Sequence, residues 1–122
     1  MSLVVVGSFG IDTIETPFGR AEDVVGGSAV YFSLAASLFS QVKLAGNIGS
    51  DFPQAPLQIL KKRGADLSGI QMFRDQATFR WTGRYEGEMN EAETLRTELN
   101  VIVEPPKIPD NYIQSPFVFL AN

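Results

Sequence analysis

Asp12 is the first side chain along the sequence whose position and charge are suited to ligand binding. It closes the segment 7–12 (Gly-Ser-Phe-Gly-Ile-Asp), which directly follows the short β-branched run at residues 3–6. The chain contains no histidine and no cysteine, so any acid–base chemistry must use Asp, Glu, Lys or Tyr. Because open α/β sheets bind ligands beyond the carboxyl ends of their strands, this position predicts a ligand-binding carboxylate. The alternative is a turn aspartate that bonds its own backbone.

Two adjacent glycines, Gly26 and Gly27, form the next notable feature. They precede Ser28, a suitable N-cap residue, and then a long apolar stretch at residues 29–39. Because this stretch is apolar on nearly all sides, it predicts a buried helix. The glycines allow a close backbone approach, either of a ligand to the start of the helix or of the helix to a strand.

These residues lie in a predicted alternation of strands and helices. The run at residues 3–6 predicts a strand covered on both faces, and residues 42–48 predict a second strand. Asp51 is expected to cap a second helix that has Pro53 in its first turn, runs to about Arg63 and ends at Gly64. The order strand, helix, strand, helix is typical of a parallel α/β sheet.

The middle of the chain changes to a period of two. Residues 79–86 and 95–103 each alternate apolar and polar side chains, and residues 87–93 between them are turn-like. This pattern predicts an antiparallel β ribbon at about residues 76–104. The acidic residues Glu88, Glu91 and Glu93 lack the spacing of a calcium loop and are interpreted as a solvated turn. A proline-rich linker at 104–109, a short helix at 110–114 and a buried strand at 116–122 are expected to follow.

Composition narrows the function further. The 122-residue chain has a formal net charge of −4 and no dense basic cluster, which argues against nucleic acid or an anionic membrane as partner. The absence of cysteine excludes disulfides and thiolate chemistry. The N-terminus lacks the basic start of a signal peptide, and no apolar run approaches the ~18 residues of a membrane span. We therefore expect a cytoplasmic protein.

Four segments in order resemble the ribokinase-like (PfkB) family of carbohydrate and nucleoside kinases: residues 7–12, Gly26-Gly27-Ser28-Ala29, residues 46–51 (Gly-Asn-Ile-Gly-Ser-Asp) and the strand 117–122. The resemblance implies an α/β fold, a parallel sheet flanked by helices with an inserted antiparallel β lid. It also implies transfer of the ATP γ-phosphoryl group to a sugar or nucleoside hydroxyl, with Mg²⁺. The family's catalytic Asp belongs to a later Gly-Ala-Gly-Asp signature, which this sequence lacks.

We therefore expect residues 1–122 to be the N-terminal, acceptor-binding part of such a kinase. A chain truncated in this way would carry no catalytic residue, bind no metal or cofactor of its own, and be inactive by itself. ATP and Mg²⁺ would belong to the complete enzyme.

The resemblance also implies which residues contact the acceptor. The expected substrate-binding residues are Asp12, which would accept hydrogen bonds from two acceptor hydroxyls, and Gly10, Gly26, Gly27, Tyr31 and Asn47. Gly10 and Tyr31 stand where many sugar-specific members carry Asn, so the pocket is less polar than a ribose pocket. This departure leaves room for a nucleoside or a substituted ring.

The lid supplies a second set of candidates, Phe79, Trp81, Arg80 and Arg84. An aromatic ring there would stack on a sugar or base, and an arginine would meet a phosphate or carboxylate. The alternative is that the apolar face packs on the main domain or forms a homodimer through the lid. Two rival functions remain open: a nucleotide- or dinucleotide-binding α/β domain, for which the third glycine of G-x-G-x-x-G is missing, and a non-catalytic ligand-binding or dimerisation module.

Overall fold

A four-stranded parallel sheet forms the body of the molecule. The computed structural model describes residues 2–122 and gives this sheet the strand order β5-β4-β1-β8. Its strands are β1 (Ser2–Val6), β4 (Gln41–Gly49), β5 (Asp66–Phe73) and β8 (Phe117–Leu120). Every neighbouring pair is parallel, as the sequence predicts. Strand β5 is absent from the sequence prediction because its apolar residues follow no regular period.

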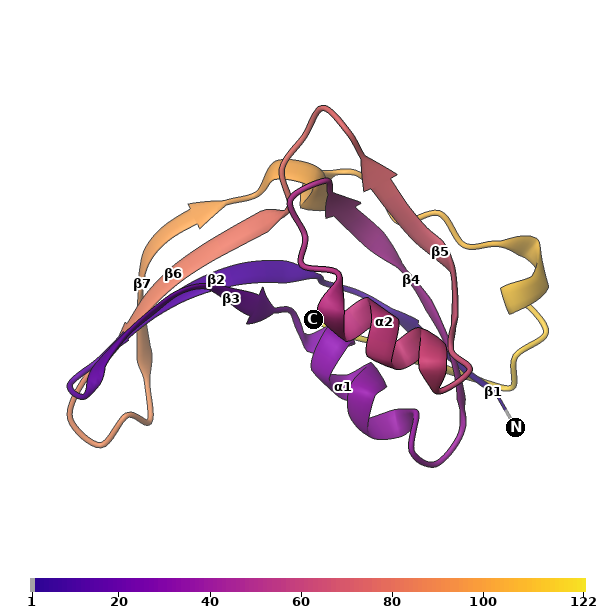
Figure 1. The fold of residues 1–122 in the computed structure, drawn as a ribbon, viewed down its shortest axis with the longest axis horizontal. Coiled ribbons are helices and arrows are strands. Elements are labelled where there is room, and N and C mark those ends of the chain that lie inside the picture. Colours follow the sequence, from indigo (N-terminus) through magenta and orange to yellow (C-terminus); the bar gives the residue numbers. More distant parts are fainter. Residues whose placement is uncertain (1) are drawn as a thin grey trace.

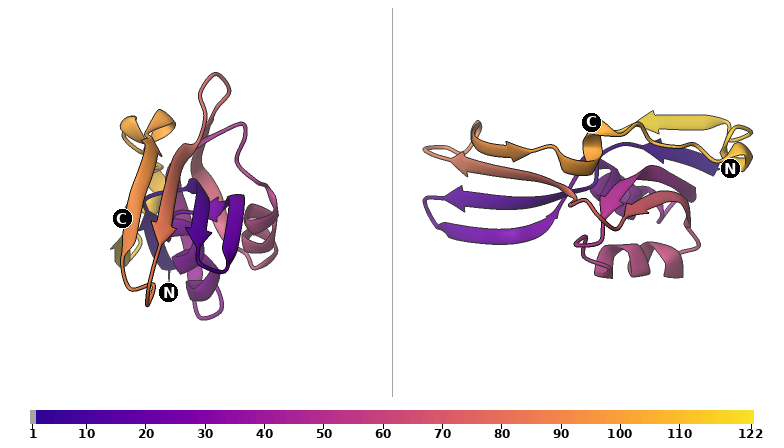
Figure 2. Two further views of the ribbon diagram at one scale, coloured as in Figure 1. Left: turned by 90° about the vertical axis from the view of Figure 1, so that its left-hand side faces the viewer. Right: turned by 90° about the horizontal axis from the view of Figure 1, so that it is seen from above.

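Two helices cover one face of the body sheet, α1 (Ser28–Ala36) and α2 (Ala55–Lys62) (Figure 1, Figure 2). Between helices and sheet lies the main core, which includes Val5, Phe9, Ile11, Val30, Leu44, Phe52 and Leu60. On the other face, Tyr112 of the short 3₁₀ helix η2 (Asp110–Tyr112) packs against Val4 and Ala45. No helix in residues 2–122 has both the length and the apolar character needed to cross a membrane.

A second four-stranded sheet projects from one end of the body and forms the lid (Figure 1, Figure 2). Its order is β3-β2-β6-β7, with strands β2 (Gly10–Thr16), β3 (Gly19–Gly26), β6 (Phe79–Tyr85) and β7 (Ala92–Glu98). The central pair β2–β6 is parallel and the outer pairs are antiparallel. Residues 76–104 therefore supply half of the lid, and the expectation of a two-stranded ribbon is corrected. Strand β2 gave no periodic signal in the sequence because each of its faces mixes apolar and polar residues, such as Ile11 with Glu15 and Ile14 with Asp12.

The second strand of the predicted ribbon is shorter than the sequence pattern suggested. Strand β7 ends at Glu98, and residues 100–103 form the 3₁₀ helix η1 (Asn100–Val103). The cause is Asn100, which adopts a positive φ of 48° and donates a hydrogen bond from its side chain to the Thr78 carbonyl at 2.9 Å. The turn that results buries Val101 completely.

The second helix begins later than the sequence predicts. Helix α2 starts at Ala55 with Gln54 at its N-cap and Pro56 in the first turn, so Asp51 does not cap it. The Asp51 carboxylate instead accepts hydrogen bonds from Thr78, at the start of the lid. The predicted end of the helix is confirmed, since Gly64 follows it with a φ of +83°.

Two segments predicted to be buried are exposed in part or in full in the residues that the structure describes. Helix α1 buries Ala29, Val30 and Ser33, while apolar side chains on its other side and in the turn after it face outward. Strand β8 is an edge strand whose four residues are all exposed. The two segments meet where the rings of Phe32 and Phe119 stack at 3.7 Å between centroids.

Candidate functional site

The junction of the two sheets contains a cavity of about 440 Å³. Three chain segments meet there: the link from β1 to β2, the link from β3 to α1, and the end of β8. The cavity is lined by Ser8, Asp12, Gly27, Ser28, Phe79, Trp81, Ile102 and Asn122. It lies at the carboxyl ends of β1 and β8, which is where open parallel sheets bind their ligands.

Asp12 lies within the lid strand β2, rather than in a loop after β1 as expected. It pairs with Val24 of β3 and with Trp81 of β6, so its carboxylate is held on a rigid sheet. Burial raises the pKa of Asp12 above its ordinary value, and no hydrogen bond or charge from the described residues opposes that shift. The cavity therefore contains a half-buried carboxylate that accepts no hydrogen bond from the described part of the chain.

Gly26 and Gly27 make this arrangement possible. A Cβ atom at Gly26 would lie 2.2 Å from Oδ2 of Asp12, so a larger residue would displace the carboxylate. Gly27 has a φ of +95°, and a Cβ there would lie 2.4 Å from the Ser8 carbonyl oxygen. That carbonyl accepts a hydrogen bond from the Ala29 amide at 3.2 Å, which seats helix α1 against the β1–β2 link. Close packing within the protein thus accounts for both glycines, and Gly27 also lines the cavity.

Gly10 and Tyr31 lie near the cavity without lining it. Gly10 opens strand β2, where an added Cβ would lie 3.2 Å from the Phe79 ring. Tyr31 is 58% exposed on the outer side of α1 and donates a hydrogen bond from its hydroxyl to the Val25 carbonyl at 2.6 Å. The structure brings neither residue to the cavity wall.

Asn47 lines a second cavity of about 220 Å³ beside the first. The two cavities share Ser8, Ile102 and Asn122. The side-chain nitrogen of Asn47 donates to the carbonyl of Glu104 at 2.7 Å and to that of Val101 at 3.4 Å. Its side-chain oxygen is buried without a partner in residues 2–122. Asn47 thus ties the segment after the lid back onto strand β4.

The lid candidates divide between the two faces of the lid sheet. Phe79 and Trp81 are on the face of Asp12 and line the cavity with it. Arg80 and Arg84 are on the opposite face, where each forms ion pairs with acidic residues of the protein. Arg84 Nε lies 3.1 Å from Glu15 Oε2. The structure therefore does not bring the two arginines to this cavity.

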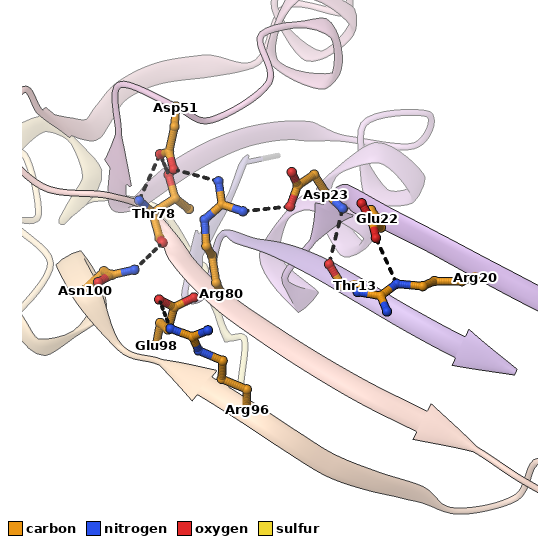
Figure 3. Close-up of polar contacts among 10 residues, drawn as sticks. All are labelled: Thr13, Arg20, Glu22, Asp23, Asp51, Thr78, Arg80, Arg96, Glu98 and Asn100. Carbon is orange, nitrogen blue, oxygen red and sulfur yellow. Dashed lines mark hydrogen bonds and ion pairs between the residues drawn. The ribbon is translucent and has the colours of Figure 1, made fainter.

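Arg80 is the centre of a polar network that connects the lid to the body (Figure 3). Its guanidinium lies 2.7 Å from Asp23 Oδ1 on β3 and 3.1 Å from Asp51 Oδ2 after β4. Burial acts to lower the pKa of Arg80, but the hydrogen bonds and charges of Asp51 and Asp23 outweigh it, and the net pKa is raised. Arg80 therefore stays charged, and its ion pairs connect the two sheets at their junction.

Sequence reasoning missed several residues of the junction. The hydroxyls of Ser8 and Ser28 both donate to the carbonyl of Asn122, and Thr78 is completely buried at the root of the lid. Ser28 is recognisable in the sequence as the residue after two glycines. Thr78 carries no such signal, because its partner Asp51 is distant in the chain.

The structure also bears on the rival sites. The glycine-containing segment after β1 leads into strand β2 and not into a helix, so the strand–loop–helix geometry of a dinucleotide motif is not formed there. Glu88, Glu91 and Glu93 are exposed in and beside the β6–β7 turn. Within residues 2–122, no group of three or more His, Cys, Asp or Glu side chains is placed to hold a metal ion.

Fold and site together define an α/β protein in which a lid sheet adjoins a cavity at the carboxyl ends of the strands of a parallel sheet. Comparison with solved structures identifies this fold as that of the ribokinase-like kinases. Ribokinase from Cryptococcus neoformans var. grubii serotype A, solved in complex with ADP, matches with a TM-score of 0.76 and 19% identity over 97% of this chain and 41% of its own. The fold that the resemblance implied is thereby confirmed.

Other kinases with this fold match similarly. Halothermothrix orenii fructokinase gives a TM-score of 0.72 at 20% identity, over 98% of this chain and 46% of its own. The nucleoside kinase of Methanocaldococcus jannaschii gives 0.71 at 15% identity, over 98% and 44%. These solved structures are more than twice as long as the chain.

Among curated proteins, the cytidine kinase of Thermococcus kodakarensis is 40% identical over 73 residues, which are 59% of this chain and 26% of that protein. No family model matches the chain. The sequence thus aligns with about a quarter of this relative, and the fold with less than half of the solved kinases.

Proposed function

We propose that residues 1–122 form the acceptor-binding part of an ATP-dependent kinase that phosphorylates a hydroxyl group of a sugar or nucleoside. The observation that carries this proposal is the Asp12 carboxylate, which lies in the cavity between body and lid and accepts no hydrogen bond from residues 2–122. A carboxylate in its ionised form only accepts hydrogen bonds, and two neighbouring hydroxyls of a sugar ring supply two donors to it.

The surroundings of Asp12 support recognition of a polyol with an apolar side. Phe79 and Trp81 provide apolar surface on the same face of the lid, while Ser8 and Ser28 provide hydroxyls at the floor of the cavity. Phosphoryl transfer depends largely on holding the acceptor hydroxyl in line with the phosphate. In this proposal, the described residues supply that positioning and the lid root keeps Asp12 at a fixed angle to the body.

ATP and Mg²⁺ belong to the proposed reaction. The acids of residues 2–122 form no cluster suited to a metal ion. We assign no residue to the phosphoryl donor or to the general base, and we expect the 122-residue chain alone to be inactive.

We further propose that strand β8 is the edge at which the body sheet continues in the complete kinase. All four residues of β8 are exposed although it pairs in parallel with β1, and parallel strands are ordinarily covered on both faces. The solved kinases with this fold have more than half of their length outside the matched part.

Titration calorimetry of the purified chain with ribose and with cytidine tests the proposal. At least one of the two is expected to bind, and Asp12→Asn is expected to weaken that binding about 10- to 100-fold, since hydrogen bonds to a charged group contribute about 1.5–3 kcal/mol. Asp75→Asn removes an exposed acid outside the cavity and is the matched control. Unchanged binding in the Asp12 variant, or no binding of either compound, would contradict the proposal.

A further inference from the structure

The indole ring of Trp81 lies directly over Gly83, two residues further along strand β6. A Cβ atom at Gly83 would lie 1.9 Å from Cη2 of Trp81, 2.4 Å from Cζ2 and 2.6 Å from Cζ3. All three atoms belong to the six-membered part of the indole, so this part occupies the space that any side chain at position 83 would need. The ring thus extends along the lid sheet rather than away from it.

A hydrogen bond fixes the other end of the ring. Trp81 Nε1 donates to Oγ1 of Thr94 at 3.1 Å, and Thr94 is the residue that pairs with Gly83 across β6 and β7. The register shift between Thr82 and Gly83 brings Thr94 to this position. The indole is therefore held at its base by β6, beneath its six-membered ring by a glycine, and at its nitrogen by β7.

This ring faces the same side of the lid as Asp12. The two residues are register partners in the parallel pair β2–β6, where paired side chains point to one face of the sheet. Both also line the 440 Å³ cavity. A carboxylate that binds hydroxyls and an aromatic ring held along the sheet are thus neighbours on one rigid surface.

We propose that Trp81 is a preformed stacking platform for a planar heteroaromatic ring of the acceptor, with Gly83 and Thr94 as its positioning residues. The inference rests on the proposed function and narrows it, because a ligand with hydroxyls at Asp12 and a flat ring at Trp81 is a nucleoside rather than a free sugar. Base stacking on an aromatic side chain favours binding by about 5- to 150-fold. Because the ring is already held in place, little side-chain entropy is lost when the base binds.

Trp81 is the single tryptophan of the chain, so intrinsic fluorescence excited at 295 nm reports on this ring alone. Cytidine is expected to change the emission of the 122-residue chain saturably and to bind about 5- to 150-fold more tightly than ribose. Ribose is expected to bind, by calorimetry, with a much smaller change in emission. Both ligands are expected to require Asp12.

Three variants separate positioning from general folding. Gly83→Ala places a methyl group where the ring now lies, and is expected to shift the emission and weaken cytidine binding at least fivefold while ribose binding changes less than twofold. Thr94→Val removes the hydrogen bond and is expected to act in the same direction with a smaller effect. Thr97→Val is the matched control, since Thr97 also pairs with Trp81 but accepts no hydrogen bond from its indole. Circular dichroism verifies the fold of each variant.

The outcomes distinguish this inference from the function on which it rests. If cytidine and ribose bind equally and neither Gly83→Ala nor Thr94→Val alters their ratio, the platform is overturned while acceptor binding at Asp12 stands. If the emission depends on protein concentration and not on cytidine, Trp81 packs against a second copy and the platform is likewise overturned. If neither compound binds the unsubstituted chain, both proposals fail.

Discussion

Asp51 accepts two hydrogen bonds from Thr78, one from its backbone amide at 2.9 Å and one from its hydroxyl at 2.7 Å. The same hydroxyl accepts a hydrogen bond from the Gly49 amide at 2.9 Å. This pair joins the end of strand β4 to the root of the lid, and Arg80 extends the connection to Asp23 on β3. Asp51 therefore connects the two sheets, a role that a helix cap would not have.

Removing the Asp51 carboxylate is expected to destabilise the protein. Asp51→Ala leaves the buried Thr78 hydroxyl without its acceptor and Arg80 with one ion pair, and we expect it to lower the free energy of unfolding by about 1–3 kcal/mol at neutral pH. Urea unfolding followed by circular dichroism measures this change. Asp75→Asn, which removes an exposed acid outside the network, controls for net charge and is expected to leave stability nearly unchanged.

The Asp51 network also predicts a dependence of stability on pH. Burial acts to raise the pKa of Asp51, but hydrogen bonds from Thr78 and Arg80 and the charge of Arg80 outweigh it, so the pKa lies below its ordinary value of 3.8. Its contribution is thus fully present above the pKa of the unfolded state and is lost as the pH falls through the lower pKa of the folded state. The stability difference between the unsubstituted protein and Asp51→Asn should shrink below about pH 4. A constant difference down to pH 2 would contradict this assignment.

Asp12 should show the opposite linkage. Burial raises its pKa in the folded state, so the stability associated with its protonated form is lost as the pH rises through that raised pKa. Asp12→Asn is therefore expected to leave the thermal unfolding midpoint at pH 7 unchanged or higher, although it weakens acceptor binding. Thermal denaturation beside calorimetric titration tests both effects on one sample. A marked loss of stability would show that the Asp12 carboxylate stabilises the fold, which would contradict its assignment as a free ligand-binding group.

The sequence predicts much of the body and little of the lid. Strands β1, β4 and β8, the two helices and the glycine at the end of α2 follow from local patterns of apolar residues and turn chemistry. Strand β2 gives no periodic signal because each of its faces mixes apolar and polar residues, and β3 gives none because it is mostly polar. Two of the four lid strands therefore cannot be recognised from the periodicity of apolar residues in the sequence.

The sequence names some of the residues that line the cavity, but not how they are arranged around it. Period-two alternation separates Phe79 and Trp81 from Arg80 and Arg84, yet it does not say which face turns to the cavity. On the face away from the cavity, Arg80 binds Asp51, a contact between residues 29 positions apart that no local pattern predicts. The support of Trp81 by Gly83 and Thr94 depends in the same way on a register shift between two strands.

Gly27 and Gly64 form a matched pair for testing the close approach at the cavity. Both have a positive φ, but a Cβ at Gly64 meets nothing within 4 Å, whereas one at Gly27 meets the Ser8 carbonyl. Gly64→Ala is expected to lower stability by about 1 kcal/mol through backbone strain alone. Gly27→Ala should cost about 1–3 kcal/mol and also weaken acceptor binding, because helix α1 must move away from the β1–β2 link. Equal costs and unaltered binding would show that the packing adapts freely at this junction.

The exposed edge of the body sheet makes a final prediction about association. Val118 lies in the middle of β8 and is 59% exposed, on an edge strand whose outer backbone groups are free to pair with another chain. Val118→Lys places a charge on this edge and is expected to reduce self-association at high concentration, measured by light scattering. Val103→Lys introduces the same charge at a residue that is 62% exposed outside the strand, and is expected to have no such effect. If both variants associate like the unsubstituted chain, β8 is not the strand through which the chains associate. The proposal that the body sheet continues at β8 then loses its main physical support.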